Sequence, residues 1–133
     1  MSTISDSILT STKKVLGLDE SYTAFDVDVT MHINSVFSIL HQLGIGPVDG
    51  FAIEDATPTW DAFLEDVLPL NTVKSYMYLQ VRMLFDPPAT SYLQESMRKQ
   101  IDELGWRINL YRESLIPVLV PPEDDDYDPL EGF

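Results

Sequence analysis

The sequence contains no cysteine. Disulfide bonds, zinc sites with thiolate ligands and thiol nucleophiles are therefore excluded within these 133 residues. The chain must instead rely on an apolar core, and its 44% hydrophobic and 11% aromatic content is sufficient for one. We expect a single domain with an appendage, because the chain is too short for two domains of ordinary size.

Basic residues are scarce: eight Lys and Arg oppose 22 Asp and Glu, for a net charge of -14. Binding to nucleic acid depends largely on cations that displace counterions from the phosphates, so we expect no ordinary nucleic-acid binding. Residues 71–114 are balanced, with six bases and five acids, whereas residues 1–70 carry eleven acids and two lysines. A balanced segment beside acidic flanks can attract other copies of the chain.

Long apolar runs are also missing. No stretch approaches the ~20 apolar residues that a membrane-spanning helix needs. The first residues lack a basic region followed by an apolar run, so we expect no export signal of this kind and no contact with a membrane.

Apolar residues recur at helical spacing in four segments. We predict helices over residues 5–16, about 26–43, about 68–85 and from Ser91 to about 115, with one further helical turn in 60–66. Gly17 and Gly44 should end the first two helices, and Ser91 with Gln94 matches a capping box for the last. The last two should pack as an antiparallel hairpin. The expected fold is all-α, a small bundle of about four helices.

The segment between the second and third long helices is rich in glycine and proline and predicts a long loop, with room for a small hairpin near residues 51–54. Phe51, Ile53 and Trp60 make it too apolar for disorder. We take these three residues as candidates for contact with other proteins. The alternative is that they pack on the chain's own helices.

The sequence ends in PVLVPPEDDDYDPLEGF, residues 117–133, with four prolines, six acids and no base. This composition predicts an extended tail after a helical domain of residues 1–116. Disorder is one interpretation. The other is a peptide that orders on a partner, because apolar side chains recur at intervals of three near its end. The candidate partner-binding residues are Val118, Val120, Asp124, Asp125, Asp126, Tyr127, Leu130 and Phe133.

No catalytic or metal-binding constellation is evident. His32 and His41 are nine residues apart on one predicted helix and would point in different directions. The acid pairs lie at helix starts or in loops, where capping and solvation explain them: Asp26 with Asp28, Glu54 with Asp55, Glu65 with Asp66. GIGPVDG has no lysine for a phosphate loop, and EDDDYD lacks the glycine and final glutamate of a calcium loop. We expect no enzyme activity, cofactor or metal.

Several stretches resemble the head-tail connector family of siphophages. They are ILTSTKKVLGLDESYTAFDVDVTMHINSVFSILHQLGIGP, GFAIEDATPTWDAF, VKSYMYLQVRMLFDPP and IDELGWRINLYRE. The likeness runs through nearly all of residues 4–114 in order. It implies a small helical virion protein that forms a dodecameric ring under the portal and receives the next connector, stopper or tail protein.

The resemblance further implies that the tail grips the portal and that genome DNA passes through the ring without specific binding. The protein would act at the neck of the virion after assembly in the host cytoplasm. Two other interpretations remain at this stage: an acidic DNA mimic that inhibits a nucleic-acid-binding enzyme, and, less favoured, a nuclease with a carboxylate-bound metal.

Overall fold

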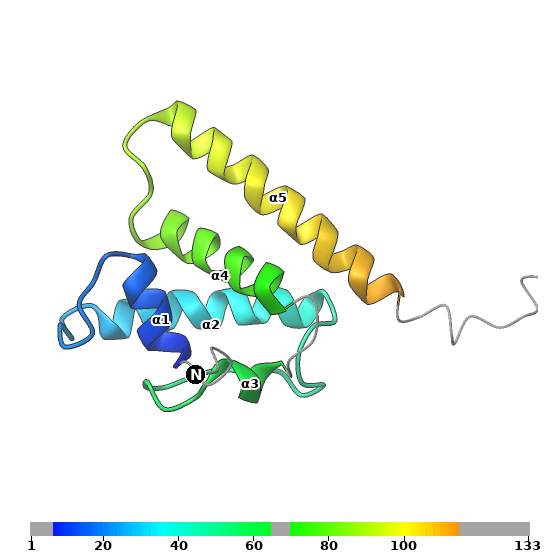
Figure 1. The fold of residues 1–133 in the computed structure, drawn as a ribbon, viewed down its shortest axis with the longest axis horizontal. Coiled ribbons are helices and arrows are strands. Elements are labelled where there is room, and N and C mark those ends of the chain that lie inside the picture. Colours follow the sequence, from blue (N-terminus) through cyan, green and yellow to red (C-terminus); the bar gives the residue numbers. More distant parts are fainter. Residues whose placement is uncertain (1–6, 65–69, 115–133) are drawn as a thin grey trace, which may run out of the picture.

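The structure is a computed structural model that describes residues 7–64 and 70–114, and within these residues all regular elements are helices. They are α1 (Ile8–Val15), α2 (Asp26–Gln42), α3 (Trp60–Phe63), α4 (Leu70–Phe85) and α5 (Ser91–Ser114) (Figure 1). The predicted all-α class is confirmed, and the single turn expected within residues 60–66 is α3. The predicted start of the third long helix near residue 68 lies outside the described residues.

The helices are layered in a simple order. α5 packs on α4, α4 packs on α2, and α1 contacts both α2 and α4 (Figure 1). The predicted pairing of the last two long helices is therefore confirmed. The core contains apolar side chains from all five helices and from the loop, with the largest fully buried ones being Trp60, Phe37, Ile8, Ile33, Leu40, Ile53, Met77 and Ile108.

Glycine ends both of the first two helices, as predicted. Gly17 and Gly44 have φ values of +83° and +85°, a region that glycine adopts without steric cost. After each glycine the chain folds back on the last helical turn: Leu18 N–H donates to the Lys13 carbonyl oxygen at 2.8 Å, and Ile45 N–H donates to the Leu40 carbonyl oxygen at 2.9 Å. These are the bonds of a Schellman motif, and they turn the chain back toward the core.

Two details of α5 and α4 differ from the prediction. The hydroxyl that caps α5 belongs to Thr90, whose Oγ1 accepts from Leu93 N–H at 3.2 Å; Gln94 instead donates to the Pro88 carbonyl oxygen. The cap lies one residue before the predicted Ser91, because Ser91 already belongs to the helix. Leu84 and Leu93 follow the apolar spacing of their helices, yet they are 50% and 51% exposed because they flank the turn that joins the two helices.

The loop between α2 and α3 contains no strand and therefore no hairpin, in contrast to the small hairpin allowed by the sequence. An isolated bridge joins Ser7 to Thr59, and Ile8 N–H donates to the Pro58 carbonyl oxygen at 3.1 Å. The end of the loop is thus tied to the start of α1. Further along the loop, the backbone of Ile53 hydrogen-bonds to a side chain of α2.

Candidate functional site

The loop is held against α2 by one side chain. Asn34 Nδ2 donates to the Ile53 carbonyl oxygen at 2.9 Å, and its Oδ1 accepts from Ile53 N–H at 2.8 Å. The amide therefore satisfies both backbone groups of a residue that is only 2% exposed. Buried backbone groups need such partners, so Asn34 replaces the second strand that a hairpin would have supplied.

We predict that Asn34→Ala will free this part of the loop and destabilise the protein by about 2 kcal/mol, because two buried backbone groups lose their partners. Asn34→Asp should be similarly harmful: its carboxylate cannot donate to the Ile53 carbonyl oxygen. Hydrogen exchange of the Ile53 amide, followed by NMR, would show faster exchange in both variants. Unchanged protection of that amide would contradict the anchoring role.

An aromatic cluster fills the space under the loop. Trp60 is fully buried, and its ring lies 6.3 Å from Phe37 and 6.1 Å from Tyr78 between ring centroids. Its Nε1–H donates to Ser11 Oγ at 3.0 Å, and the Lys74 ammonium lies 5.7 Å from the centre of its ring. Trp60 therefore joins α1, α2 and α4 at one point.

The structure assigns clear positions to the three loop residues selected from the sequence. Ile53 and Trp60 are buried within the chain, and Phe51 is half-buried against Phe37 and Phe63. The single chain thus shows the packing that was kept as the alternative. Contact of these residues with other proteins stays a prediction, and the candidate residues of the tail lie outside the described residues.

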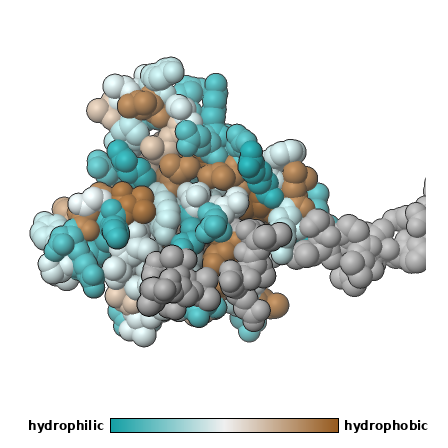
Figure 2. Space-filling model, in the orientation of Figure 1, coloured by the Kyte–Doolittle hydropathy of each residue, from teal (hydrophilic) through white to brown (hydrophobic). Residues whose placement is uncertain are grey.

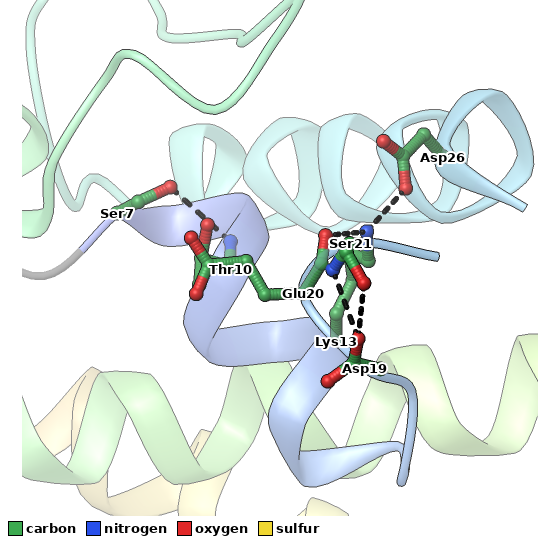
Figure 3. Close-up of polar contacts among 7 residues, drawn as sticks. All are labelled: Ser7, Thr10, Lys13, Asp19, Glu20, Ser21 and Asp26. Carbon is green, nitrogen blue, oxygen red and sulfur yellow. Dashed lines mark hydrogen bonds and ion pairs between the residues drawn. The ribbon is translucent and has the colours of Figure 1, made fainter. Parts of the chain in front are cut away.

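A lysine joins the first two helices (Figure 3). The Lys13 side chain is 3% exposed; its Nζ lies 2.8 Å from Asp26 Oδ1 and donates to the Glu20 carbonyl oxygen at 3.0 Å. In the segment that connects α1 to α2, the hydroxyl and the backbone N–H of Ser21 donate to the Asp19 carboxylate. These hydrogen bonds hold the pKa of Asp19 below its usual value. These contacts link α1, the segment that follows it and the start of α2, so their role is structural.

Several large apolar side chains that were not among the contact candidates from the sequence are exposed. On α2, Val27 and Met31 are 74% and 59% exposed; on α5, Tyr92, Trp106 and Leu110 are 80%, 61% and 43% exposed. The signal was present in the sequence, since all five lie off the helical stripes that form the core. Figure 2 shows apolar patches between hydrophilic ones on one face of the molecule.

Features of catalytic sites are not gathered anywhere in the described part of the chain. Asp26 is paired with Lys13, while Asp28, Glu54 and Asp55 are exposed. His32 packs against Phe85, with ring centroids 6.4 Å apart. No group of three or more His, Cys, Asp or Glu side chains that could hold a metal occurs among the described residues, and none of the helices described is long and apolar enough to cross a membrane.

Comparison with known proteins gave one finding. Residues 8–114, about four fifths of the chain, match the family model described as phage connector protein. Neither the curated proteins nor the solved structures gave a match. The matched region spans all five helices, from the first residue of α1 to the last of α5. The described contacts serve to hold a helical fold together, and the family match covers all of its helices. The chain therefore belongs to the phage connector protein family.

Proposed function

We propose that this connector protein forms a ring, a dodecamer in the virion, that docks beneath the portal and links the DNA-filled capsid to the next neck protein or the tail. The observation that carries the proposal is the family match over residues 8–114. A phage connector has a structural role, and membership supports oligomerisation and partners at the head-tail junction. The ring, its subunit number and the individual partners are our inference.

The surface of the described chain supports a role in assembly. Large apolar side chains are exposed on α2 and on α5, which lie on different sides of the bundle. A ring needs two different contact surfaces on each subunit, because each copy meets one neighbour on either side. Exposed aromatic and methionine side chains are typical of such surfaces.

The acidic character of the chain would also suit a channel. If part of the net charge of -14 faces the lumen, it repels the DNA phosphates, so that the genome passes without binding. This is the opposite of what a DNA mimic would do, since a mimic presents its carboxylates to the basic cleft of an enzyme. The two functions therefore make different predictions about partners.

The deciding experiment is to mix the purified protein with the portal of its phage and image the complex by electron microscopy. We expect a ring coaxial with the portal. A protein that stays monomeric, does not bind the portal and inhibits a nuclease would overturn the proposal in favour of the DNA mimic. A monomer in solution would not decide the question, because connector subunits can assemble on docking.

A second prediction concerns the tail. Deleting residues 117–133 should leave the helical signal in circular dichroism nearly unchanged, because all described helices precede it. Attachment to the portal should weaken about tenfold or more if Tyr127, Leu130 and Phe133 are anchors. The matched control replaces only these three residues with alanine and keeps the six acids. Unchanged attachment of both variants would show that the tail does not grip the portal.

A further inference from the structure

A groove of about 480 Å³ runs between α4 and α5. Tyr78 and Leu79 of α4 and Leu104 of α5 line it and are half-buried. Exposed polar side chains of both helices also line it, among them Ser75 and Arg107. A groove with apolar side chains between polar ones suits an extended peptide that presents an apolar side chain at every second position.

The α4 side of this groove carries positive charge. α4 contains Lys74 and Arg82 and no acid. Arg82 donates to the backbone carbonyl oxygen of Asp86, and among the described residues no carboxylate forms an ion pair with Arg82 or Lys74. Glu103 is the acid that lines the groove, and its ion pair with Arg107 at 2.7 Å offsets its charge.

Charge also disfavours the rest of the described chain as a site for an acidic peptide. Residues 7–64 carry two lysines and eight acids, whereas residues 70–114 carry six bases and five acids. Lys13, one of the two lysines, is already buried in an ion pair. An acidic segment is therefore repelled least by the α4–α5 layer.

The first part of the tail has the matching sequence. In an extended chain Val118 and Val120 point to one side and Leu119 to the other. The three prolines in residues 117–122 favour an extended backbone over a helix. Four consecutive acids follow at residues 123–126. The segment thus offers an apolar pair to a groove and negative charge beyond it.

The end of α5 places this segment beside the groove. α5 ends at Ser114, two turns after Arg107 and so on the same side of the helix, about 10 Å further on. A Cβ on Gly105 would lie 3.3 Å from the Tyr76 ring, so these two residues are level in the antiparallel pair (Figure 1). Arg82 is then level with residue 99 of α5, about 22 Å from the end of that helix.

The lengths agree if the chain turns back at residues 115–116. An extended chain advances about 3.3 Å per residue. Residues 118–120 then lie about 7 to 13 Å back along α5, beside Arg107 and Leu104. Glu123 lies about 23 Å back, level with Arg82. Tyr127 lies about 36 Å back, which is the full length of α5, so it reaches the turn between α4 and α5.

We propose that residues 117–126 dock in the α4–α5 groove of their own chain, with Val118 and Val120 against Leu79 and Leu104, and the acids beside Arg82. The chain's own tail is the occupant because it continues directly from α5, which gives it a high effective concentration at the groove. This docking does not depend on the proposed function. It leaves the three proposed portal anchors, Tyr127, Leu130 and Phe133, at the α4–α5 turn.

The first test uses the full chain with Asp125→Cys, the only cysteine, coupled to a nitroxide spin label. The label broadens the NMR signals of nearby amides. We expect the strongest broadening at Ser96 and Arg82, because the docked tail carries residue 125 to that end of the groove. A tail that does not dock would instead broaden Arg112 most, since it stays near its attachment point. That result would overturn the inference.

A mixing control identifies which chain supplies the tail. Isotope-labelled native chain is mixed with unlabelled chain that carries the spin label at residue 125. We expect no broadening at Ser96 in this mixture, because each groove holds its own tail. Broadening in the mixture as strong as within one chain would place the tail in the groove of another copy and would contradict the proposal.

The second test changes the side chains that the tail presents. In the spin-labelled chain, Val118→Ser with Val120→Ser should shift the docking equilibrium about tenfold toward the free tail, because two apolar side chains no longer leave water. The matched control is Leu119→Ser, whose side chain points away from the groove, and it should keep the broadening at Ser96. Equal effects of the two variants would reject the predicted orientation of the tail.

The third test removes the cation that faces the acids. Arg82→Gln should weaken docking about twofold or more, because the acids lose an opposite charge at the groove. Arg98→Gln is the matched control, since Arg98 is exposed on α5 but does not line the groove. It should leave the broadening at Ser96 unchanged. Equal losses in both variants would show that only the overall charge matters, against the proposed contact.

One consequence rests on the proposed function. If the last residues of the tail grip the portal, the α4–α5 turn should be the end of the subunit nearest the portal in the imaged complex. The opposite end nearest the portal would reject this placement but not the docking. Broadening at Ser96 without portal binding would reject the proposed function alone. Portal binding without that broadening would reject the docking alone.

Discussion

Trp60→Ala should destabilise the protein by about 3 to 5 kcal/mol, one of the two largest effects expected from a single substitution. Trp60 is fully buried, and its ring joins α1, α2 and α4. Alanine would leave a cavity at this junction and remove the hydrogen bond to Ser11. Because whole domains are stable by only about 5 to 15 kcal/mol, the loss would be a large share of the total. Urea unfolding followed by circular dichroism measures it.

The sequence offers a matched control, since it contains two tryptophans. Trp106→Ala removes the same side chain from a site that is 61% exposed and should change the stability of the monomer by no more than about 0.5 kcal/mol. Ser11→Ala removes the acceptor of Trp60 Nε1–H together with the bond that the Ser11 hydroxyl donates to the Ile8 carbonyl oxygen, and should cost about 1 kcal/mol. Equal unfolding midpoints for Trp60→Ala and Trp106→Ala would contradict the packing described for Trp60.

Asp26→Ala should cost about 3 kcal/mol or more, because it leaves the Lys13 ammonium without its counter-ion. The Lys13 side chain is 3% exposed, so water cannot readily replace the carboxylate, and among the described residues its remaining hydrogen-bond partner is the Glu20 carbonyl oxygen. The substitution also removes a negative charge from the first turn of α2, where it interacts favourably with the helix dipole.

The opposite substitution should be milder. Lys13→Met keeps most of the apolar stem and leaves Asp26, whose side chain is 30% exposed, within reach of water. We expect a cost of about 1 to 2 kcal/mol for it, and little further loss when Asp26→Ala is added. Urea unfolding of the native chain, both single variants and the double variant yields the coupling energy. Strictly additive losses would show that the two side chains do not interact.

Much of the fold could be predicted because the helices follow local rules. The apolar stripe of α2, from Val29 to Leu40, is buried as its spacing indicated, and Gly17 and Gly44 end their helices with positive φ. The loop could not be predicted in the same way. Its conformation depends on the Asn34 side chain, 19 residues away from Ile53, and no local pattern reveals such a pairing.

The two tryptophans show that the candidate contact residues, too, could be predicted only in part from the sequence. The sequence selected Trp60 because it lies in a glycine- and proline-rich segment, yet its ring is the centre of the core. Trp106 was passed over as part of a clear helix, although it is the exposed one. Exposure depends on which face of each helix meets a neighbour, and that is settled only when the helices pack.

The sequence by itself determined the helical class, the glycine ends of the first two helices, the excess of acid and the likeness to phage connectors, because periodicity, capping and charge are local or additive properties. Only the tertiary structure decided that Lys13 is buried beside Asp26, that the loop is held on α2, and that apolar residues remain exposed on opposite sides of the bundle. These features arise from contacts between residues far apart in the chain, whose energies depend on the packed arrangement as a whole.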